Sequence, residues 1–228
     1  MPDILIVEDE RTIREGLKRL FAAEGFSARA FRDAESALAA FAERRPDIVL
    51  LDIMLPSRNG FCVCEDIRRM DPLVPIMFHT ALDGPEQRLR GLEAGADDYV
   101  LKTDRPAEML ARVRRALARM EAFRRASSDA IAPIRLGKVE VDFPRMEVRD
   151  GRRFASTLTR TEADILRFLM ASRGKVVAAD EILAEIRGEG FVCDGNTIYV
   201  HMANLRKKLG PSSSLLVCHP RSGYELLQ

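Results

Sequence analysis

The chain has 228 residues, 31% of them charged, with a formal net charge of +1 and four cysteines. This length exceeds one typical domain and suits two domains, each of about 100–120 residues and large enough for a core of its own. The longest apolar run is far shorter than the roughly 20 residues that a membrane-spanning helix needs. The N-terminal Met-Pro-Asp lacks a signal-peptide pattern and no cysteines have C-x-x-C spacing, so we expect reduced thiols and a cytoplasmic location.

The near-zero net charge hides a difference between the two halves of the chain. Residues 1–122 carry 19 Lys and Arg against 22 Asp and Glu, a net of −3, whereas residues 130–228 carry 15 against 12, a net of +3. An acidic first half before a basic second half fits a metal or phosphate site followed by a nucleic-acid binder. Because this difference in net charge is small, it is only supporting evidence for such a division of roles.

The first half alternates short apolar segments with amphipathic ones. Strands are expected near residues 3–8, 27–31, 47–52, 75–80 and 97–101. Helices are expected near residues 10–24, 34–44, 59–70, 85–95 and 105–122. Five such β/α units predict an α/β domain over residues 1–122, with a five-stranded parallel sheet covered on both faces. Right-handed crossovers favour the doubly wound strand order 2-1-3-4-5.

The second half has a different pattern. Residues 123–135 lose periodicity and are expected to form a linker, and short alternating strands with an Asp150-Gly151 hairpin turn follow. Thr159 to Glu162 form a capping box that opens a helix, and further helices are predicted near residues 180–187 and 196–209. With a closing hairpin near the C-terminus, these elements predict an α+β winged helix-turn-helix domain over residues 136–228.

Polar groups stand at the ends of four predicted strands: Glu8-Asp9, Asp52, Thr80 and Lys102. Ligands bind at the carboxyl ends of parallel strands where the strand order reverses, and the expected order brings Glu8 and Asp9 beside Asp52. Clustered carboxylates repel one another unless a cation joins them, and hard oxygen ligands with room for water suit Mg²⁺. We expect Glu8, Asp9, Asp52 and the main-chain carbonyl of Met54 to hold this ion.

The same residues suit phosphoryl transfer to a carboxylate. Such a reaction needs an anionic nucleophile in line with the phosphorus, and positive charge on the phosphoryl oxygens. Asp52 is the candidate nucleophile, Lys102 the second cation, and Thr80 the hydroxyl that hydrogen-bonds a phosphate oxygen. The alternative is that these carboxylates and the lysine are ordinary solvent-exposed charges. That explanation must account for chemically complementary groups at four strand ends at once.

Four motifs of the first half resemble those of two-component receiver domains: Ile4-Leu-Ile-Val-Glu8-Asp9-Glu10, Leu51-Asp52-Ile-Met-Leu-Pro56-x-x-x-Gly60, Thr80-Ala81 and Gly95-Ala-Asp-Asp-Tyr99-x-x-Lys102. Two motifs of the second half resemble the winged-helix domain of OmpR/PhoB-family response regulators: Leu158-Thr-x-x-Glu162 and Thr197-Ile-x-Val-His201-Met-x-x-Leu-Arg206-Lys-Lys-Leu209. The resemblance implies a flavodoxin-like receiver phosphorylated on Asp52 by a sensor histidine kinase. It also implies a homodimer on activation that binds double-stranded promoter DNA, with RNA polymerase as a further partner.

In such receivers Thr80 would move toward the phosphate and Tyr99 would turn inward, which repacks the face of the fourth helix, fifth strand and fifth helix. Tyr99 is equally explained as an aromatic at the sheet edge. Candidate dimer contacts on this face pair Arg88 with Glu108, Asp97 with Arg112, and Asp98 with Arg119. Exposed pairs contribute ~0–1 kcal/mol each, and a solvated charged face is the alternative.

The predicted helix from Asn196 to Leu209 has an apolar stripe for the core and a polar face that suits the major groove. Candidate base contacts come from Asn196 and Asn204, with shape or methyl contacts from Tyr199 and Ala203. Candidate phosphate contacts come from Thr197, Arg206, Lys207 and Lys208. In the closing hairpin, Arg221 is placed to enter a minor groove. His201 fits either a phosphate contact or a half-buried imidazole, of which we favour the second. A charged face on an ordinary helical bundle is the alternative for the whole helix.

The chain departs from the family pattern in three places. Thr103-Asp104 replaces a Pro-Phe pair whose Lys-Pro bond is cis; because a cis bond before a non-proline residue costs ~2.5–4 kcal/mol, we expect a trans loop and a shifted Lys102. Ala203 and Asn204 replace arginines, and residues 219–223 replace an Arg-Gly-x-Gly tip. We therefore expect phosphorylation to couple less tightly to dimerisation. For the DNA-binding helix we expect either weaker electrostatic anchoring or a different operator that is richer in A·T pairs.

Two other functions compete with a phosphorylated transcription regulator. A phosphohydrolase of the haloacid-dehalogenase type needs a second carboxylate two residues after the nucleophile, where this chain has Met54. A regulator that works through protein contacts without phosphate is the other, and Thr103-Asp104 keeps it open. We expect no enzyme activity beyond the receiver's own phosphoryl transfer and dephosphorylation.

Overall fold

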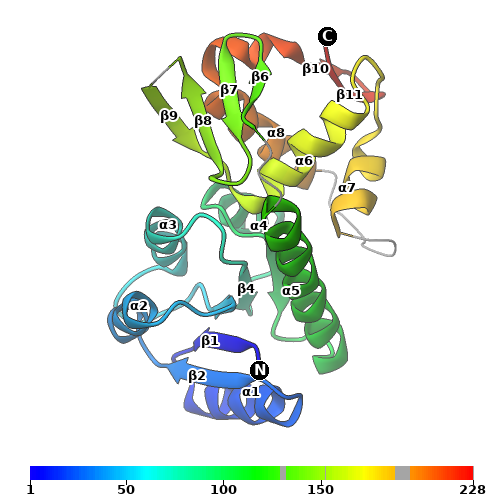
Figure 1. The fold of residues 1–228 in the computed structure, drawn as a ribbon. Helices are drawn as coiled ribbons and strands as arrows, with labels where there is room; N and C mark the ends of the chain where they lie inside the picture. Colours follow the sequence, from blue (N-terminus) through cyan, green and yellow to red (C-terminus); the bar gives the residue numbers. More distant parts are fainter. Residues whose placement is uncertain (129–131, 152, 188–195, 228) are drawn as a thin grey trace. The chain divides into compact units, whose positions relative to one another are not determined.

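The computed structural model describes residues 1–128, 132–151, 153–187 and 196–227 (Figure 1). The chain divides into two compact units, residues 1–122 and residues 123–228. Each unit has its own sheet and its own helices, and each is described by itself below.

The first unit is built on a five-stranded parallel sheet. Its strands are β1 (Asp3–Val7), β2 (Ser27–Phe31), β3 (Ile48–Leu51), β4 (Ile76–Thr80) and β5 (Asp98–Leu101). They pair in the order β2-β1-β3-β4-β5, which confirms the predicted doubly wound sheet. The register places Val7 beside Leu51 and Leu51 beside Phe78, so β1, β3 and β4 end at the same edge of the sheet.

Helices cover both faces of this sheet. They are α1 (Arg11–Ala23), α2 (Ala34–Glu43), α3 (Gly60–Met70), α4 (Pro85–Glu93) and α5 (Pro106–Ser128). Successive strand side chains point to opposite faces, so Leu5 and Val7 pack with α2 and α3 whereas Ile4 and Ile6 pack with α1 and α5. Figure 1 shows α2 and α3 on one side of the sheet and α1 and α5 on the other. Two apolar layers therefore hold the strand ends in fixed register.

The second unit begins with a four-stranded antiparallel sheet, β6-β7-β8-β9. Its strands are β6 (Ile134–Leu136), β7 (Val139–Asp142), β8 (Glu147–Asp150) and β9 (Arg153–Thr157). The helices are α6 (Arg160–Ala171), α7 (Ala179–Arg187), α8 (Asn196–Leu209) and the 3₁₀ turn η1 (Gly210–Leu215). The hairpin of β10 (Leu216–His219) and β11 (Gly223–Leu226) closes the unit, which confirms the predicted winged helix-turn-helix class.

The capping box at the start of α6 is present in full. The Thr159 side chain accepts a hydrogen bond from the Glu162 backbone N–H, and the Glu162 carboxylate accepts one from the Thr159 backbone N–H. This motif satisfies two of the backbone donors that a helix N-terminus leaves without a partner. It fixes the start of the helix that packs against α8 in the core.

The segment expected to be a linker, residues 123–135, is partly regular structure. Helix α5 continues to Ser128, and strand β6 starts at Ile134. Arginine and alanine are good helix formers, so the helix extends past the loss of apolar periodicity. A strand of three residues is too short to show an alternating pattern. Residues 129–131 lie outside the described part of the chain.

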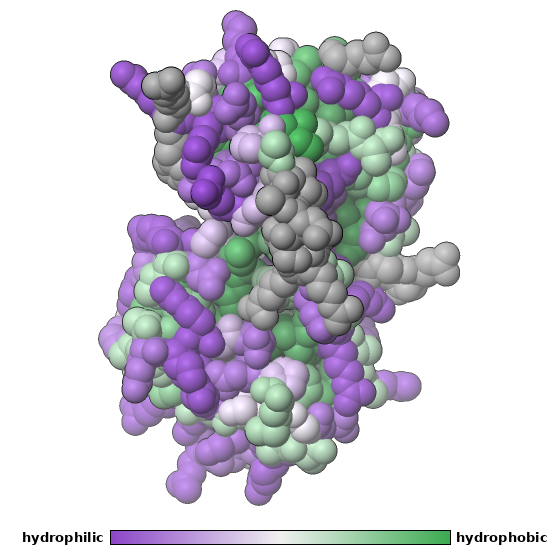
Figure 2. All heavy atoms as spheres, in the orientation of Figure 1, coloured by the Kyte–Doolittle hydropathy of each residue, from purple (hydrophilic) through white to green (hydrophobic). Residues whose placement is uncertain are grey.

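The surface is largely polar. On the face that Figure 2 shows, hydrophilic side chains predominate over each unit, and smaller apolar areas are scattered among them. Among the described residues, the structure contains no helix with the length and apolar character needed to cross a bilayer.

Two glycines of the first unit provide a matched test of its packing. A Cβ added to Gly60 would lie 2.2 Å from the backbone oxygen of Asp52, whereas one added to Gly16 would meet nothing within 4 Å. Gly60→Ala should destabilise the unit by about 1–3 kcal/mol through overpacking. Gly16→Ala should stabilise it by about 0.5–1 kcal/mol through helix propensity. Urea unfolding of the full chain, followed by amide exchange in β1 and β3, checks both, and equal effects would contradict the described packing.

Candidate acidic site and nucleic-acid interface

Three carboxylates meet at the carboxyl edge of the parallel sheet. Glu8 and Asp9 follow β1, Asp52 follows β3, and ligand oxygens from all three lie within 4.8 Å of one another. The Asp52 N–H donates to the carbonyl of Val7 at 2.9 Å, so the two strand ends are tied together directly beneath the carboxylates. Glu8 and Asp52 are buried and Asp9 is exposed, so the cluster opens to solvent on the side of Asp9.

Lys102 provides the positive charge of this cluster. Its Nζ donates to Asp52 Oδ2 at 2.7 Å and to Glu8 Oε1 at 2.8 Å. Burial opposes the charge of Lys102, but its hydrogen bonds to Asp52 and Glu8 outweigh burial, and the pKa of the ammonium is raised. The peptide bonds of the described residues are all trans, as expected for Lys102-Thr103. The ammonium reaches both carboxylates, so Lys102 remains in the site with a trans bond after it.

Asp104 helps to form this turn in place of an apolar residue. Its carboxylate accepts a hydrogen bond from the Leu101 N–H at 2.9 Å, and its own N–H donates to the Leu101 carbonyl. A short acidic side chain that binds its neighbouring backbone is a common way to stabilise a tight turn. The loop that carries Lys102 is therefore closed by local hydrogen bonds rather than by a proline ring.

Glu8 has one carboxylate oxygen that no described residue satisfies. Glu8 is only 1% exposed, and its Oε2 is buried without a hydrogen-bond partner. Desolvation raises the pKa of Glu8, although the hydrogen bond from Lys102 acts in the opposite direction. A buried acceptor without a donor is costly, and a cation beside it removes the cost. The three carboxylates, with one orphaned oxygen, fit a divalent metal ion held by hard oxygen ligands.

His79 is a neighbour of this site that sequence reasoning passed over. It lies in β4 directly before Thr80, is 7% exposed, and its Nδ1 is 3.9 Å from Glu8 Oε2. That separation is too long for a hydrogen bond. Burial, assisted by the charge of Lys102, lowers the pKa of His79 to about 4, so the imidazole is neutral at pH 7. The signal that could have found it is a histidine inside an otherwise apolar strand.

Thr80 and Tyr99 both contact the backbone of Leu82. Thr80 is buried, and its Oγ1 accepts from the Leu82 N–H at 3.3 Å. The Tyr99 hydroxyl donates to the Leu82 carbonyl at 2.6 Å, and the Tyr99 ring lies 6.1 Å from that of Phe78. One residue of the loop after β4 therefore links the two side chains that were expected to act as a switch.

The expected dimer contacts are rearranged within the chain. Asp97 is 5% exposed and is held by Arg68 at 2.6 Å and by the Ile76 N–H at 2.9 Å, so its assignment to a dimer surface is wrong. Arg112 contacts Asp98 and Glu108 of its own chain. The charges of Arg112 and Asp98 are therefore paired without the expected partners in a second subunit. Arg119 is partly exposed on α5, and the Arg88 side chain lies outside the described part of the structure.

Several of the side chains that were expected to contact DNA are exposed to solvent. Tyr199 is 63% exposed, Ala203 and Lys207 are exposed, and Asn204 is partly exposed. Arg221 is exposed at the hairpin tip, where its φ of 65° is in the left-handed region. The side chains of Asn196 and Thr197 lie outside the described part of the structure.

Three other expected DNA contacts have structural roles instead. His201 is 2% exposed, so a phosphate contact from it is wrong and its place is in the core. Arg206 donates to the Leu216 carbonyl through Nε and Nη2, which fastens α8 to the closing hairpin. Lys208 donates to the buried Glu162 carboxylate at 2.6 Å. Periodicity could not separate these cations from exposed ones, because their partners come from distant segments.

Comparisons with known proteins agree for both units. Residues 4–114 match a family described as the response regulator receiver domain, and residues 154–226 match one described as the C-terminal domain of transcriptional regulatory proteins. Response regulator MprA of Mycobacterium bovis BCG is 38% identical over 205 residues, 90% of this chain and 87% of the relative. The chain is an OmpR/PhoB-family response regulator.

Other comparisons extend this result over the whole length of the response regulator. MprA of Mycobacterium leprae is 36% identical over 220 residues, 96% of this chain and 95% of the relative. The structure of DrrB, a Thermotoga maritima OmpR/PhoB homologue, is 26% identical with a TM-score of 0.50 over all of both chains. A mutant of RitR has a TM-score of 0.82 over 99% of both chains at 21% identity, which shows the shared fold.

Membership of this family indicates the general role of the protein and the classes of its partners. The response regulator is part of a two-component system and acts in transcription. Its receiver implies a sensor kinase as partner and its second domain implies DNA. The acidic pocket of Glu8, Asp9 and Asp52 is suited to a divalent metal ion.

Removing the Lys102 ammonium should make the stability of the response regulator depend strongly on pH. In Lys102→Met, Glu8 loses the hydrogen bond that lowers its pKa, so the folded-state pKa rises further above the ordinary value of 4.5. A raised carboxyl pKa means that stability is present at low pH and is lost as pH rises. With EDTA present, the variant should lose roughly 2–4 kcal/mol at pH 7 and much less near pH 4.5.

Urea unfolding from pH 4.5 to pH 7 measures this difference. Lys18→Met, which removes an exposed lysine on α1, is the matched control and should follow the wild-type curve. If the free energy of unfolding of Lys102→Met fell below that of the wild type by the same amount at every pH, the described charge cluster would be contradicted.

Proposed function

We propose that a sensor histidine kinase phosphorylates Asp52 of this response regulator in a Mg²⁺-dependent reaction, and that the phosphorylated protein dimerises and binds promoter DNA. The observation that carries this proposal is the contact of Lys102 Nζ with Asp52 Oδ2 at 2.7 Å inside a cluster of three carboxylates. A nucleophilic carboxylate, a fixed cation and an orphaned metal-ligand oxygen are the parts that phosphoryl transfer to aspartate needs.

Hydrogen bonds to both of its oxygens fix the orientation of the Asp52 carboxylate, which supports its proposed role as the nucleophile. Oδ1 accepts from the Met54 N–H at 3.2 Å, and Oδ2 accepts from Lys102. One oxygen forms the new P–O bond as the P–N bond of the kinase phosphohistidine breaks, and the departing imidazole takes up a proton. Lys102 then neutralises a phosphoryl oxygen, and the Thr80 hydroxyl donates to another.

Glu8, Asp9, Asp52 and the Met54 carbonyl would hold the Mg²⁺ ion. When bound, the ion supplies positive charge to the phosphoryl oxygens. Hydrolysis of the acyl phosphate by the receiver itself would return Asp52 to its free carboxylate. We propose a cytoplasmic setting for this cycle, as expected from the sequence.

The shared contacts of Leu82 offer a route from the phosphoryl group to the surface. If Thr80 turns toward the phosphate, it leaves the Leu82 N–H, and the loop whose carbonyl holds the Tyr99 hydroxyl is released. Tyr99 then turns inward and repacks the face of α4, β5 and α5. Dimerisation would use the remaining candidates on this face: Arg88, Asp98, Glu108, Arg112 and Arg119. Because Asp98 and Glu108 already contact Arg112 within the chain, coupling between phosphorylation and dimerisation would be loose.

The DNA-binding surface would combine α8 with the tip of the closing hairpin. Asn204 and Asn196 are proposed to contact bases, with Tyr199 and Ala203 contributing shape and thymine-methyl contacts. Lys207, Thr197 and Arg221 are proposed to contact phosphates or the minor groove. RNA polymerase would be a further partner at promoters. The exposure of Tyr199, Ala203 and Lys207 on one helix supports this surface.

Labelling with acetyl phosphate tests the first part of this proposal. In the presence of Mg²⁺ the wild-type protein should acquire a phosphoryl group on Asp52, detected by mass spectrometry, and Asp52→Asn should acquire none. Asp9→Asn should label more slowly and need more Mg²⁺, because one proposed metal ligand is lost. Asp180→Asn, an exposed change on α7, should label like the wild type. Label on Asp52→Asn, or Mg²⁺-independent label on the wild type, would contradict the proposal.

DNA selected from a random pool tests the second part. Asn204→Ala should relax the preference at one base pair by about 1–3 kcal/mol, because a bidentate base contact is lost. Lys207→Ala should weaken all sites alike and reduce the slope of log K against log salt by about 1 per half-site.

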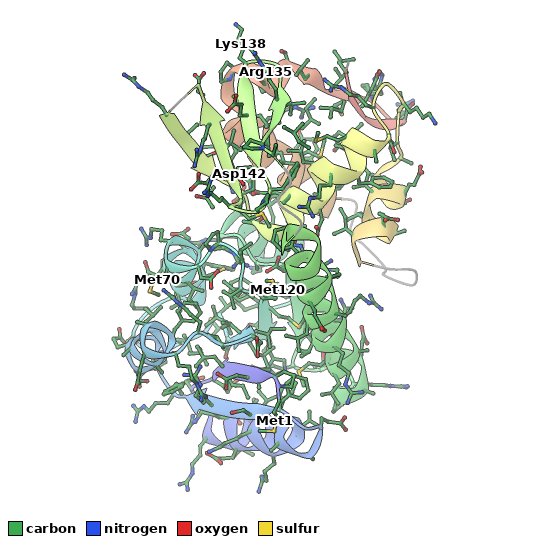
Figure 3. All side chains as sticks on the ribbon, in the orientation of Figure 1. Met1, Met70, Met120, Arg135, Lys138 and Asp142 are labelled. Atoms are coloured by element: carbon green, nitrogen blue, oxygen red, sulfur yellow. The ribbon has the colours of Figure 1, made fainter. Side chains whose placement is uncertain are left out.

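The matched control is Lys138→Ala, which removes an exposed cation at the turn between β6 and β7 (Figure 3). This variant should bind like the wild type. The assignment fails if Lys207→Ala changes sequence preference while Asn204→Ala leaves it unchanged.

A further inference from the structure

A cavity of about 310 Å³ lies in the first unit beside the acidic site, with which it shares Lys102. Helix α1 contributes Ile13, Leu17 and Leu20 to its wall, and Met109 lies on the side of α5. Small-molecule sites in proteins are mostly apolar hollows of about 300–1,000 Å³ with a few placed polar groups. This cavity is at the lower end of that range, so it suits a small ligand.

The cavity exists where this chain has little side-chain volume. Gly16 of α1 lines it without a side chain, and Asp104 lines it with a short one. The Asp104 carboxylate is directed to the Leu101 backbone, with which it forms a 2.9 Å hydrogen bond. Neither residue therefore fills the space between α1 and the loop after β5.

His79 provides the polar group of the cavity. The imidazole lines the cavity and is 7% exposed, and its Nδ1 has no hydrogen-bond partner among the described residues. Nδ1 lies on the side of Glu8 Oε2, 3.9 Å away, so the ring places its proton there, toward the negative charge. Nε2, on the opposite edge of the ring, is then left as an acceptor. A ring nitrogen that accepts hydrogen bonds, on a side chain buried among aliphatic groups, favours a ligand that donates one.

We propose that this cavity binds a small, mostly apolar molecule that carries one hydrogen-bond donor, a hydroxyl or an N–H, which donates to Nε2 of His79. The apolar body of the ligand packs against the α1 leucines and Met109. Because Lys102 also lines the cavity and contacts both Asp52 and Glu8, the ligand touches a group of the phosphoryl site. Ligand binding therefore alters the rate at which Asp52 accepts a phosphoryl group, a consequence that rests on the proposed function.

Binding is measured on the full chain with methyl-labelled methionines, because Met109 lines the cavity. The probe is indole, which has an N–H donor, and its matched partner is 1-methylindole, which has none. Indole should shift the Met109 methyl signal saturably, and 1-methylindole should bind at least tenfold more weakly. His79→Phe, which keeps a ring but removes the acceptor, should bind the two probes equally.

A side chain added to Gly16 should fill the cavity. Gly16→Leu should abolish the Met109 shift, and Ile13→Phe is a second filling variant in case the first does not fold. Lys18→Leu adds the same side chain to an exposed position of α1 and should bind indole like the wild type. An unshifted Met109 signal at the solubility limit of indole, or an equal shift in both filled variants, would overturn the site.

The effect on phosphorylation is measured separately. Saturating indole should change the rate of acetyl phosphate labelling at Asp52 at least twofold in the wild type. The labelling rate of Gly16→Leu should be the same with and without indole. An unchanged rate at a saturated Met109 signal would overturn the regulatory link. If Asp52 took no label at all, the proposed function would fail, whereas the Met109 result would still decide the binding site.

Discussion

The first unit depends on one buried charge cluster, in which Lys102 joins the carboxylates of Asp52 and Glu8. Removing charges from water costs several kcal/mol per ion, and only close, well-oriented partners recover that cost. The two strand ends that carry the carboxylates are fixed by backbone hydrogen bonds and by packed layers on both faces of the sheet. Packing of the apolar core therefore holds the negatively charged carboxylates close together, and the ammonium of Lys102 offsets their electrostatic repulsion. The orphaned oxygen of Glu8 shows that the compensation is incomplete.

The same incompleteness explains why the site is suited to chemistry. A fully satisfied ion cluster would be stable and inert, whereas this cluster retains an acceptor for a cation and an open side at Asp9. Phosphorylation would exchange one carboxylate for a group with more negative charge. Lys102 lies where it would meet that charge, and a bound metal ion would neutralise more of it. Thr80 and Tyr99 are connected to each other through a single loop residue, Leu82.

The sequence was sufficient to predict the sheet order, the winged helix class and the acidic trio, because these follow from local patterns. Strand periodicity and right-handed crossovers determine which strand ends meet, and hence that Glu8 and Asp9 lie near Asp52. The errors arose where a side chain's partner lies far away in the chain. Asp97 was expected on the surface, but Arg68 and the end of β4 hold it in the interior. His79 was overlooked because no local pattern shows that a strand residue borders a cavity.

The pairing of Lys208 with Glu162 has a consequence for how tightly a single subunit can hold an operator. Glu162 also closes the first turn of α6, so a phosphate that recruited Lys208 would leave a buried carboxylate without its counterion. Arg206 is similarly committed to the hairpin. A monomer would thus form a weak, short-lived complex on an isolated half-site. In the proposed dimer, residence on DNA would then come from avidity, because one of two linked winged helices can rebind before both dissociate.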